Sequence, residues 1–429
     1  MRGSPLYGGI KALLTCDSGE VVAGIVGFVV SQSRLLRILS NAMQRTAGPP
    51  LATAIIVLNA LRCYLGVSLS GDGDSVTVAR RPNERRAVAH FTRMAAGYRF
   101  ADLAIGWKLR SIWDGLTVRT PWLLRDCRRT RRLTRAWCRR YGVFRTLRAL
   151  ELIAYYTRYL ELLRSSSFRV AVMSTHSNPH GIALNLAARR LGIPIALITH
   201  GMPIRPIARL HYDLAIHECA ASRRIYEEAG CRMGVTVIKS RRDQHAPMQL
   251  PAPGVPITVG LFLSKDPVDA QVMQCLRALT VDSRVTRIIV RPHPMNLWRD
   301  MHARIASLGD ARIRVVANTC LAGDLARCDV VVAGNSTVLL DAVVAGVPAC
   351  YVSGLDHGPY DVQDFVKDGL IAEWSARLRL DLRTIERFYL RREWPRILRH
   401  YADVDRSSDE VAVAVRAALD AICRTEAVA

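Results

Sequence analysis

Short runs of aliphatic residues alternate with helical segments from Ser165 onward, and this alternation most limits the folds open to the chain. It predicts strands joined by crossover helices, the pattern of a parallel α/β sheet. In the first series, we expect helices over Gly181 to Leu191 and Ala220 to Ala229, and strands over Phe168 to Ser174, Ile193 to Ile198, Tyr212 to His217 and Val235 to Ile238.

A second series of the same kind follows a proline-rich segment. Gln244 to Pro256 contains four prolines and one glycine, which is typical of a linker or hinge. The strands expected after it are Ile257 to Leu263, Val285 to Val290, Ile313 to Val316, Asp329 to Ala333 and Ala349 to Val352. Because 429 residues exceed one ordinary core, we expect two Rossmann-like lobes with a cleft between them and a helical C-terminal tail.

The chain is strongly basic, with a formal net charge of +23 and only five lysines among its 60 basic residues. Such a charge favours an anionic partner: a phosphorylated substrate, an acidic polymer, a membrane surface or nucleic acid. Arginines are dense over residues 80–165, and a solvated helix face explains them equally well. The apolar residues at helical spacing there predict an amphipathic helix: Leu147, Leu150, Ile153, Tyr156 and Leu160.

Targeting and membrane signals are weak. Met1 to Ala23 has no clean apolar region followed by a small-residue cleavage site, so secretion is not expected. Leu51 to Ser70 is long enough to span a bilayer but has Arg62 near its middle, so we expect a buried helix, or a helix and a strand. The eleven cysteines include no CxxC pair, which is typical of reduced thiols in a cytosolic protein.

The segment CDVVVAGNSTVLLDAVVAGVPACYV, residues 328–352, carries the strongest chemical signal. A strand ends at Ala333, Gly334 permits a tight turn, and Asn335, Ser336 or Thr337 is placed to cap the next helix. A capped helix at the carboxyl edge of a parallel sheet is a common place for a phosphate, so Asn335, Ser336 and Thr337 are candidates for phosphate binding. The alternative is an ordinary capped helix with no ligand.

A second motif, RPHP, ends another predicted strand of the same lobe. Arg291 and His293 are delivered to the carboxyl end of that strand, and the two prolines stiffen the turn. A histidine there can hydrogen-bond a phosphate oxygen and stabilise charge that develops on a leaving group. A loop histidine is otherwise structural.

The third motif, THGMP, lies in the first lobe, where a strand leads to His200 and Gly201. A neutral imidazole there is suited to accept the proton of an acceptor hydroxyl. His176 and His180 follow another strand of the lobe and, together with Gly201, are candidates for acceptor contact. With His200 they could in principle bind a metal, but nothing in the sequence fixes that geometry, and we expect neither a metal nor a cofactor.

Other motifs carry less weight. Asp72 and Asp74 in GDGDS mimic the DxD of metal-dependent transferases, yet glycine beside aspartate more often makes a turn. The sequence contains neither a GxxxxGK[ST] phosphate loop nor a GxGxxG fingerprint. Nucleotide hydrolysis and dinucleotide redox chemistry are therefore disfavoured.

In this order, THGMP, RPHP and GNSTVLLDAVVAGVP resemble motifs of the GT-B enzymes of bacterial surface-polymer synthesis. The resemblance is to the CDP-glycerol glycerophosphotransferases of teichoic acid assembly and to capsule transferases with an HP motif, polysialyltransferases included. It covers Phe168 to Trp374, about half the chain. It implies that His200 is a general base, that His293 contacts donor phosphate with the hydroxyls of Ser336 and Thr337, and that Asp341 is an acidic position near the nucleotide.

The resemblance implies an acceptor-side lobe over residues 1–250, a nucleotide-donor lobe over 251–380 and helices over 381–429 that pack back on the lobes. It also implies a transferase that moves a sugar or polyol phosphate from a nucleotide-activated donor, cytidine slightly favoured over uridine. The acceptor would be an anionic glycan or a lipid-linked molecule. We expect a cytoplasmic enzyme, peripheral on the inner face of the plasma membrane.

Two other functions stay open. Non-hydrolysing sugar-nucleotide epimerases share the two-lobed fold and a His-Pro segment, although they favour Asp-Ser-Gly-Gly over GNST. The arginine-rich stretch from Arg125 to Arg148 would also suit a nucleic-acid-binding or membrane-binding protein with a decayed catalytic lobe. No nucleic-acid-recognition motif is present, so nucleic acid is not expected as a partner.

Overall fold

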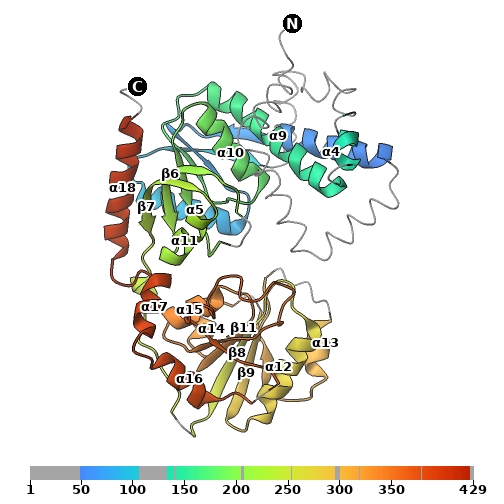
Figure 1. The fold of residues 1–429 in the computed structure, drawn as a ribbon, viewed down its shortest axis with the longest axis vertical. Helices are drawn as coiled ribbons and strands as arrows, with labels where there is room; N and C mark the ends of the chain where they lie inside the picture. The colour runs from blue at the N-terminus through green and yellow to red at the C-terminus, as the bar shows by residue number, and fades with distance from the viewer. Residues whose placement is uncertain are drawn as a thin grey trace. The chain divides into compact units, whose positions relative to one another are not determined.

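The computed structural model describes residues 49–105, 132, 134–139, 142–203, 207–252, 254–294, 300–317, 319–377 and 379–425. They form two compact units. Unit 1 comprises the described residues up to Glu218, Ser222–Ile238 and those from Asp409 onward; unit 2 comprises Cys219–Ala221 and Lys239–Ser408. Each unit is built on its own sheet (Figure 1), so the predicted α/β class with two parallel-sheet lobes is confirmed.

Unit 1 contains a seven-stranded sheet in the order β1-β3-β2-β4-β5-β6-β7. All neighbours are parallel except β1 and β3, which are antiparallel. The strands are β1 (Val67–Ser70), β2 (Ser75–Val78), β3 (Phe100–Ile105), β4 (Ala171–Met173), β5 (Ile195–Ile198), β6 (His211–His217) and β7 (Arg232–Ile238). The GDGDS segment is the turn between β1 and β2, as expected.

Helices cover the faces of this sheet. On one face, α5 (Pro82–Met94) and α18 (Ser408–Thr425) pack against apolar residues of β4, β5 and β6. Phe91 of α5, Val415 of α18 and Val172 of β4 are buried members of one hydrophobic cluster. Figure 1 shows α18 beside β6 and β7. Chain segments more than 300 residues apart therefore share one core. Helix α11 (Ala220–Glu228) connects β6 to β7.

Helices α4 (Pro49–Leu65) and α10 (Pro179–Arg190) both pack against α9 (Val143–Arg164). Leu51 to Ser70 thus forms most of α4 and all of β1, as the helix-and-strand alternative predicted. The helix over residues 147–160 is also confirmed, but its amphipathic character is wrong: residues 152–159 are all buried, including Arg158. The physical reason is that α9 has neighbours on two sides, so no broad solvent face remains.

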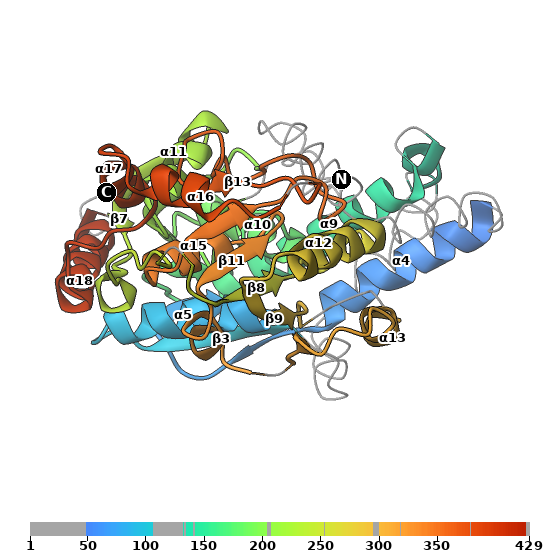
Figure 2. The same ribbon diagram turned by 90° about the horizontal axis from the view of Figure 1, so that it is seen from below.

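Unit 2 contains a six-stranded, all-parallel sheet in the order β10-β9-β8-β11-β12-β13. Figure 2 shows β11, β8 and β9 side by side. The strands are β8 (Ile257–Phe262), β9 (Val285–Arg291), β10 (Ile313–Val315), β11 (Val330–Ala333), β12 (Ala349–Tyr351) and β13 (Ala372–Glu373). The helices are α12 (Asp269–Val281), α13 (Met301–Ala306), α14 (Leu321–Leu325), α15 (Val338–Val344), α16 (Leu382–Tyr389) and α17 (Trp394–Tyr401), with a 3₁₀ turn at Arg242–Gln244.

The proline-rich segment packs on unit 2. The amide of Ala246 donates to the carbonyl of Val344 at 2.9 Å, and that of Gln249 to Gly346 at 2.7 Å. Gly346 has a φ of +78°, and a Cβ there would lie 2.3 Å from the carbonyl oxygen of Pro247. Only glycine therefore fits at the end of α15 beneath this segment.

The described residues include the candidate membrane segment and most of the cysteines. Among them, no helix is long and apolar enough to span a bilayer. Cys63, Cys219, Cys231, Cys275, Cys328 and Cys350 are buried, and Cys320 is exposed. The arginine-rich stretch from Arg125 to Arg148 lies partly outside the described residues.

Candidate functional site

Strand register brings two of the sequence motifs to one edge of the unit 2 sheet. Arg291, Phe262 and Ala333, the last residues of β9, β8 and β11, lie opposite one another across the sheet. The RPHP turn follows the first of these strands and the GNST turn follows the third, so a single strand separates them. Neighbouring strands are about 4.8 Å apart, which puts the two turns within reach of one phosphate-bearing ligand.

A lysine that sequence reasoning missed lies at this edge. Lys265 follows β8, the strand between the two motifs, and its ammonium is close enough to His293 to affect that ring. Desolvation and the charge of Lys265 both lower the pKa of His293, whose side chain is exposed. At neutral pH, His293 is therefore a neutral hydrogen-bonding group beside a fixed positive charge.

Removing that charge has a predictable consequence. In a Lys265→Met variant, the pKa of His293 should rise toward its ordinary value, because a neighbouring cation no longer disfavours the imidazolium. The measurement is an NMR titration of the His293 ring protons in both proteins. The matched variant Lys367→Met removes an exposed lysine that pairs with Asp364, and it should leave the titration unchanged. An unaltered or lowered value after Lys265→Met would disprove this electrostatic coupling.

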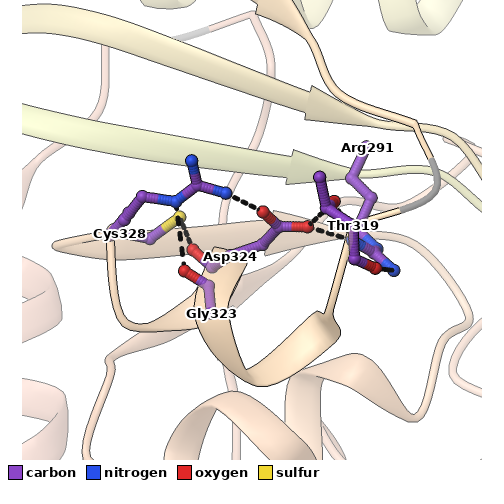
Figure 3. A network of polar contacts seen from close by, with 6 residues as sticks. Arg291, Thr319, Gly323, Asp324 and Cys328 are labelled. Carbon is purple, nitrogen blue, oxygen red and sulfur yellow. Dashed lines mark hydrogen bonds and ion pairs between the residues drawn. The ribbon is translucent and has the colours of Figure 1, made fainter.

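Arg291 is tied into the protein, as Figure 3 shows. Its guanidinium pairs with the carboxylate of Asp324 on α14 and donates to the hydroxyl of Thr319 at 2.7 Å and to its carbonyl at 2.9 Å. Asp324 is fully buried and also pairs with Arg327. Burial by itself raises the pKa of Asp324. Thr319 and the two arginines have the larger combined effect, so the pKa is lowered. The described contacts of Arg291 thus anchor the end of β9 to α14.

Asn335 organises the GNST turn through the loop that follows β12. Its amide nitrogen donates to Asp356 at 2.9 Å and to the carbonyl of Pro359 at 2.8 Å, and its amide oxygen accepts from Val362 at 3.0 Å. The backbone N–H of Asn335 donates to Asp356 at 2.7 Å. At Gly334, a Cβ would lie 2.5 Å from the carboxylate of Asp356, so glycine is needed for this close approach.

Two hydroxyls remain on the turn. Thr337 occupies the N-cap position of α15 but forms no side-chain cap hydrogen bond. Ser336 Oγ accepts from the backbone N–H of Val338 at 3.4 Å, near the limit of a hydrogen bond. Both residues are half-buried. Asp341, one turn into α15, accepts from Arg241 Nη1 at 2.6 Å. No local pattern predicts this partner, which lies 100 residues earlier in the chain.

His200 lies at the carboxyl edge of the unit 1 sheet, just after β5. Its Nδ1 is 2.6 Å from the carbonyl oxygen of Ser174 and 3.1 Å from the hydroxyl of the same residue. Because a carbonyl oxygen can only accept, Nδ1 carries a proton, and in the neutral ring Nε2 keeps the lone pair. The ring is exposed, and Gly201 follows it with no atom within 4 Å of an added Cβ. This is the arrangement that a general base requires.

His176 is near His200 but has a different partner. Its Nδ1 lies 2.6 Å from the hydroxyl of Tyr226, and the two rings form an edge-to-face contact with centroids 5.1 Å apart. Burial and the neighbouring His200 lower the pKa of His176 to about 3. His176 is therefore uncharged at neutral pH and adds no positive charge beside His200.

His180 is buried within unit 1. Its Nε2 lies 3.3 Å from Glu84, the third residue of α5, whose carboxylate is fully buried. The same carboxylate accepts from Asn178 at 3.0 Å and from the backbone N–H groups of Arg80 and Arg81 at 2.8 and 3.1 Å. Burial alone would raise the pKa of Glu84, but the hydrogen bond and charge of His180 and the two backbone donors lower it to about 2. His176, His180 and His200 thus have three separate partners, and the predicted acceptor contact of His180 is wrong because its ring is buried against Glu84.

This buried carboxylate should stabilise unit 1. A pKa lowered from 4.5 to about 2 corresponds to about 3 kcal/mol, present above the unfolded pKa and lost as the pH falls toward 2. Glu84→Gln should therefore lower the free energy of unfolding by about 3 kcal/mol at pH 7, measured by urea denaturation. The difference from wild type should shrink between about pH 5 and 2. Glu227 is half-exposed, and among the described residues its carboxylate pairs with Arg223. Glu227→Gln should therefore cost less than about 1 kcal/mol; equal losses would contradict this.

Comparisons with known proteins give fold likenesses only. No known family model matches the chain, and neither does any curated protein. Among solved structures, a putative UDP-N-acetylglucosamine 2-epimerase from Listeria monocytogenes is similar at 10% identity and a TM-score of 0.47, covering 81% of this chain and 95% of its own.

Two similar structures are described as glycosyltransferases. The calicheamicin glycosyltransferase CalG4 is 13% identical with a TM-score of 0.42, covering 82% of this chain and 97% of its own. SnogD from Streptomyces nogalater is 19% identical with a TM-score of 0.30, covering 64% and 77%. Likenesses at this level transfer no residue roles, so the functional argument rests on the residues described above.

Proposed function

We propose that this protein is a transferase that moves a sugar or polyol phosphate from a nucleotide-activated donor to a surface-polysaccharide or lipid-linked acceptor. One observation carries the proposal: the ends of β9, β8 and β11 lie in register, so that RPHP, Lys265 and GNST share one sheet edge. In parallel α/β sheets, ligands bind at the carboxyl ends of the strands. The residues gathered there are donors suited to phosphate oxygens.

In this proposal, the donor phosphates contact His293, Lys265 and the hydroxyls of Ser336 and Thr337. The lysine supplies positive charge, and the neutral imidazole and hydroxyls supply hydrogen bonds. Arg291, Asn335 and Asp341 act indirectly, through other protein residues. Their described contacts are with Asp324, Asp356 and Arg241, respectively. They hold the two turns in place around the ligand. These groups stabilise the charge of the departing nucleotide without a metal ion.

The acceptor is activated by His200. The acceptor oxygen attacks the anomeric carbon of a sugar donor, or the phosphorus of a polyol phosphate donor, and the bond to the nucleotide phosphate oxygen breaks. The hydroxyl proton passes to Nε2 of His200, since Nδ1–H is held by the carbonyl of Ser174. His176 and Gly201 flank the acceptor hydroxyl. The family proposed is that of the HP-motif transferases of bacterial surface polymers, with a cytidine donor favoured over uridine.

The basic chain supports a place on the inner face of the plasma membrane. A formal charge of +23 favours contact with anionic lipid headgroups or with an anionic glycan. Lipid-linked acceptors would be within reach at that surface.

A thermal-shift screen with CMP, CDP, UDP, GDP and their sugar and polyol conjugates tests the proposal. A ligand that binds only the folded chain raises the apparent melting temperature, so the donor nucleotide should stand out from the others. No stabilisation by any of them would refute the proposal. Incubating the stabilising conjugate without acceptor separates transfer from epimerisation, because only an epimerase would convert the sugar under these conditions.

A further inference from the structure

Arg80 and Arg81 form an exposed, positively charged turn at the carboxyl edge of the unit 1 sheet. They follow β2, whose Val78 lies opposite Met173, the last residue of β4. The residue after Met173 is Ser174, which holds His200 through its carbonyl oxygen. With strands about 4.8 Å apart, the arginine turn starts one strand from Ser174 and two strands from the one that leads to His200.

A buried carboxylate holds the backbone of this turn. Glu84 accepts the N–H groups of both arginines with one oxygen and the side-chain amide of Asn178 with the other. Asn178 in turn donates to the hydroxyl of Thr175 at 2.9 Å. The turn and the loop that orients His200 are therefore parts of one connected network, and the two arginine side chains remain exposed.

The charge of the turn is not neutralised within the described part of the chain. No described carboxylate forms an ion pair with the guanidinium of Arg80 or Arg81. The carboxylate of Glu84 instead contacts backbone and side-chain donors inside the fold. A guanidinium is a planar fork that binds phosphate or carboxylate through two parallel hydrogen bonds. Two adjacent forks suit a diphosphate or closely spaced carboxylates.

We infer that Arg80 and Arg81 bind an anionic group of the acceptor beside the hydroxyl that His200 deprotonates. This inference rests on the proposed function, in which the acceptor enters at this edge. The shared chemistry is an anion with several oxygens, whose source is either the diphosphate of a lipid carrier or the carboxylates of an acidic glycan. The turn would position the acceptor so that only a hydroxyl at a set distance from the anion reaches Nε2 of His200.

Binding measurements with two soluble probes test the site. The full chain is titrated by calorimetry with geranyl diphosphate, which represents the lipid carrier, and with trigalacturonic acid, which represents the acidic glycan. Arg80→Gln/Arg81→Gln should weaken binding of one probe at least about tenfold, and the affected probe identifies the source. The Lys/Lys variant, which keeps charge but loses the fork, should lie between wild type and the Gln/Gln variant.

The matched control removes the same charge elsewhere in unit 1. Arg189 and Arg190 are both exposed at the C-terminal end of α10, which leads to the opposite edge of the sheet. Arg189→Gln/Arg190→Gln should change affinity less than about twofold, because only long-range charge is lost and salt screens it. Equal weakening in both double variants would overturn the site, as would no weakening in either.

Three further results are decisive. If the arginine variant lost binding only to phosphatidylglycerol vesicles, the turn would be a membrane contact and the inference would be wrong. If the probes depended on Arg80 and Arg81 while no nucleotide stabilised the chain, the anion site would stand and the transferase proposal would fail. If a nucleotide bound and transfer occurred without any dependence on the two arginines, the reverse would hold.

Discussion

His200→Ala should lower the turnover number about a thousandfold and leave donor affinity unchanged. General-base catalysis contributes roughly 10²- to 10⁴-fold, and the ring is oriented for it by the 2.6 Å hydrogen bond to Ser174. The donor phosphates bind elsewhere in the proposed mechanism, so only the chemical step loses a group. The measurement is kcat under saturating donor, with the donor dissociation constant measured separately by calorimetry.

His211→Ala is the control for this substitution. His211 lies at the opposite end of a strand in the same sheet, and its ring bonds the neighbouring Asp213 at 3.1 Å. It should retain turnover within about twofold, because its half-buried ring lies away from the carboxyl edge and an alanine keeps the backbone carbonyl that accepts from Asn185. The smallest typical contribution of a general base to the rate is about a hundredfold. If His200→Ala kept more than about a tenth of the wild-type turnover, the loss would be too small and His200 would not be the base.

His293→Ala should lower kcat/KM by about 10²- to 10³-fold, with most of the loss in kcat. A preorganised donor that faces developing negative charge contributes more to the transition state than to ground-state binding. The lowered pKa of His293, set by desolvation and Lys265, means that the neutral ring performs this role at neutral pH. Steady-state kinetics with varied donor separates the two parameters.

A second histidine of unit 2 supplies the comparison. His302 is exposed on α13, and His302→Ala should leave both kinetic parameters nearly unchanged. Normal donor affinity together with normal turnover in His293→Ala would show that RPHP has a structural role. A rise in KM with kcat intact would instead show uniform binding of donor and transition state.

Local patterns predicted the elements that are built from contiguous residues. The aliphatic runs of β8, β9, β11 and β12 are buried on both faces, as in a parallel sheet, and each has bounds close to the predicted ones. Strand ends then predicted that RPHP and GNST lie at one sheet edge, because parallel strands of a sheet end on the same side. The structure adds the strand register, which pairs Ala333 with Phe262 and Phe262 with Arg291 and so separates the two motifs by one strand.

Long-range pairings could not be predicted in the same way. Strands β2 and β3 are only four and six residues long and lie beside an arginine-rich region, so their place in the sheet was missed. Glu84 meets His180 across 96 residues, and Arg241 meets Asp341 across 100. No local period marks such contacts, because they depend on how the whole sheet brings helix starts and strand ends together.

Asn335 illustrates the same limit at the candidate site. Its sequence position suggested a helix cap or a ligand contact, whereas its side chain bonds Asp356, Pro359 and Val362. The GNST sequence alone does not predict that the loop after β12 packs against Asn335. The two hydroxyls that follow, on Ser336 and Thr337, are therefore the part of the motif left for a ligand in the proposed mechanism.

The central claim is that donor phosphates bind the GNST and RPHP edge of unit 2. Calorimetric titration of wild type and of Ser336→Ala/Thr337→Val with CDP, UDP and the corresponding nucleosides tests it most directly. We predict that one diphosphate binds wild type and binds the double variant at least about tenfold more weakly, since each lost hydrogen bond to a charged group contributes about 1.5 to 3 kcal/mol. The phosphate-free nucleoside should not distinguish the two proteins. Equal diphosphate affinity in both would contradict the claim.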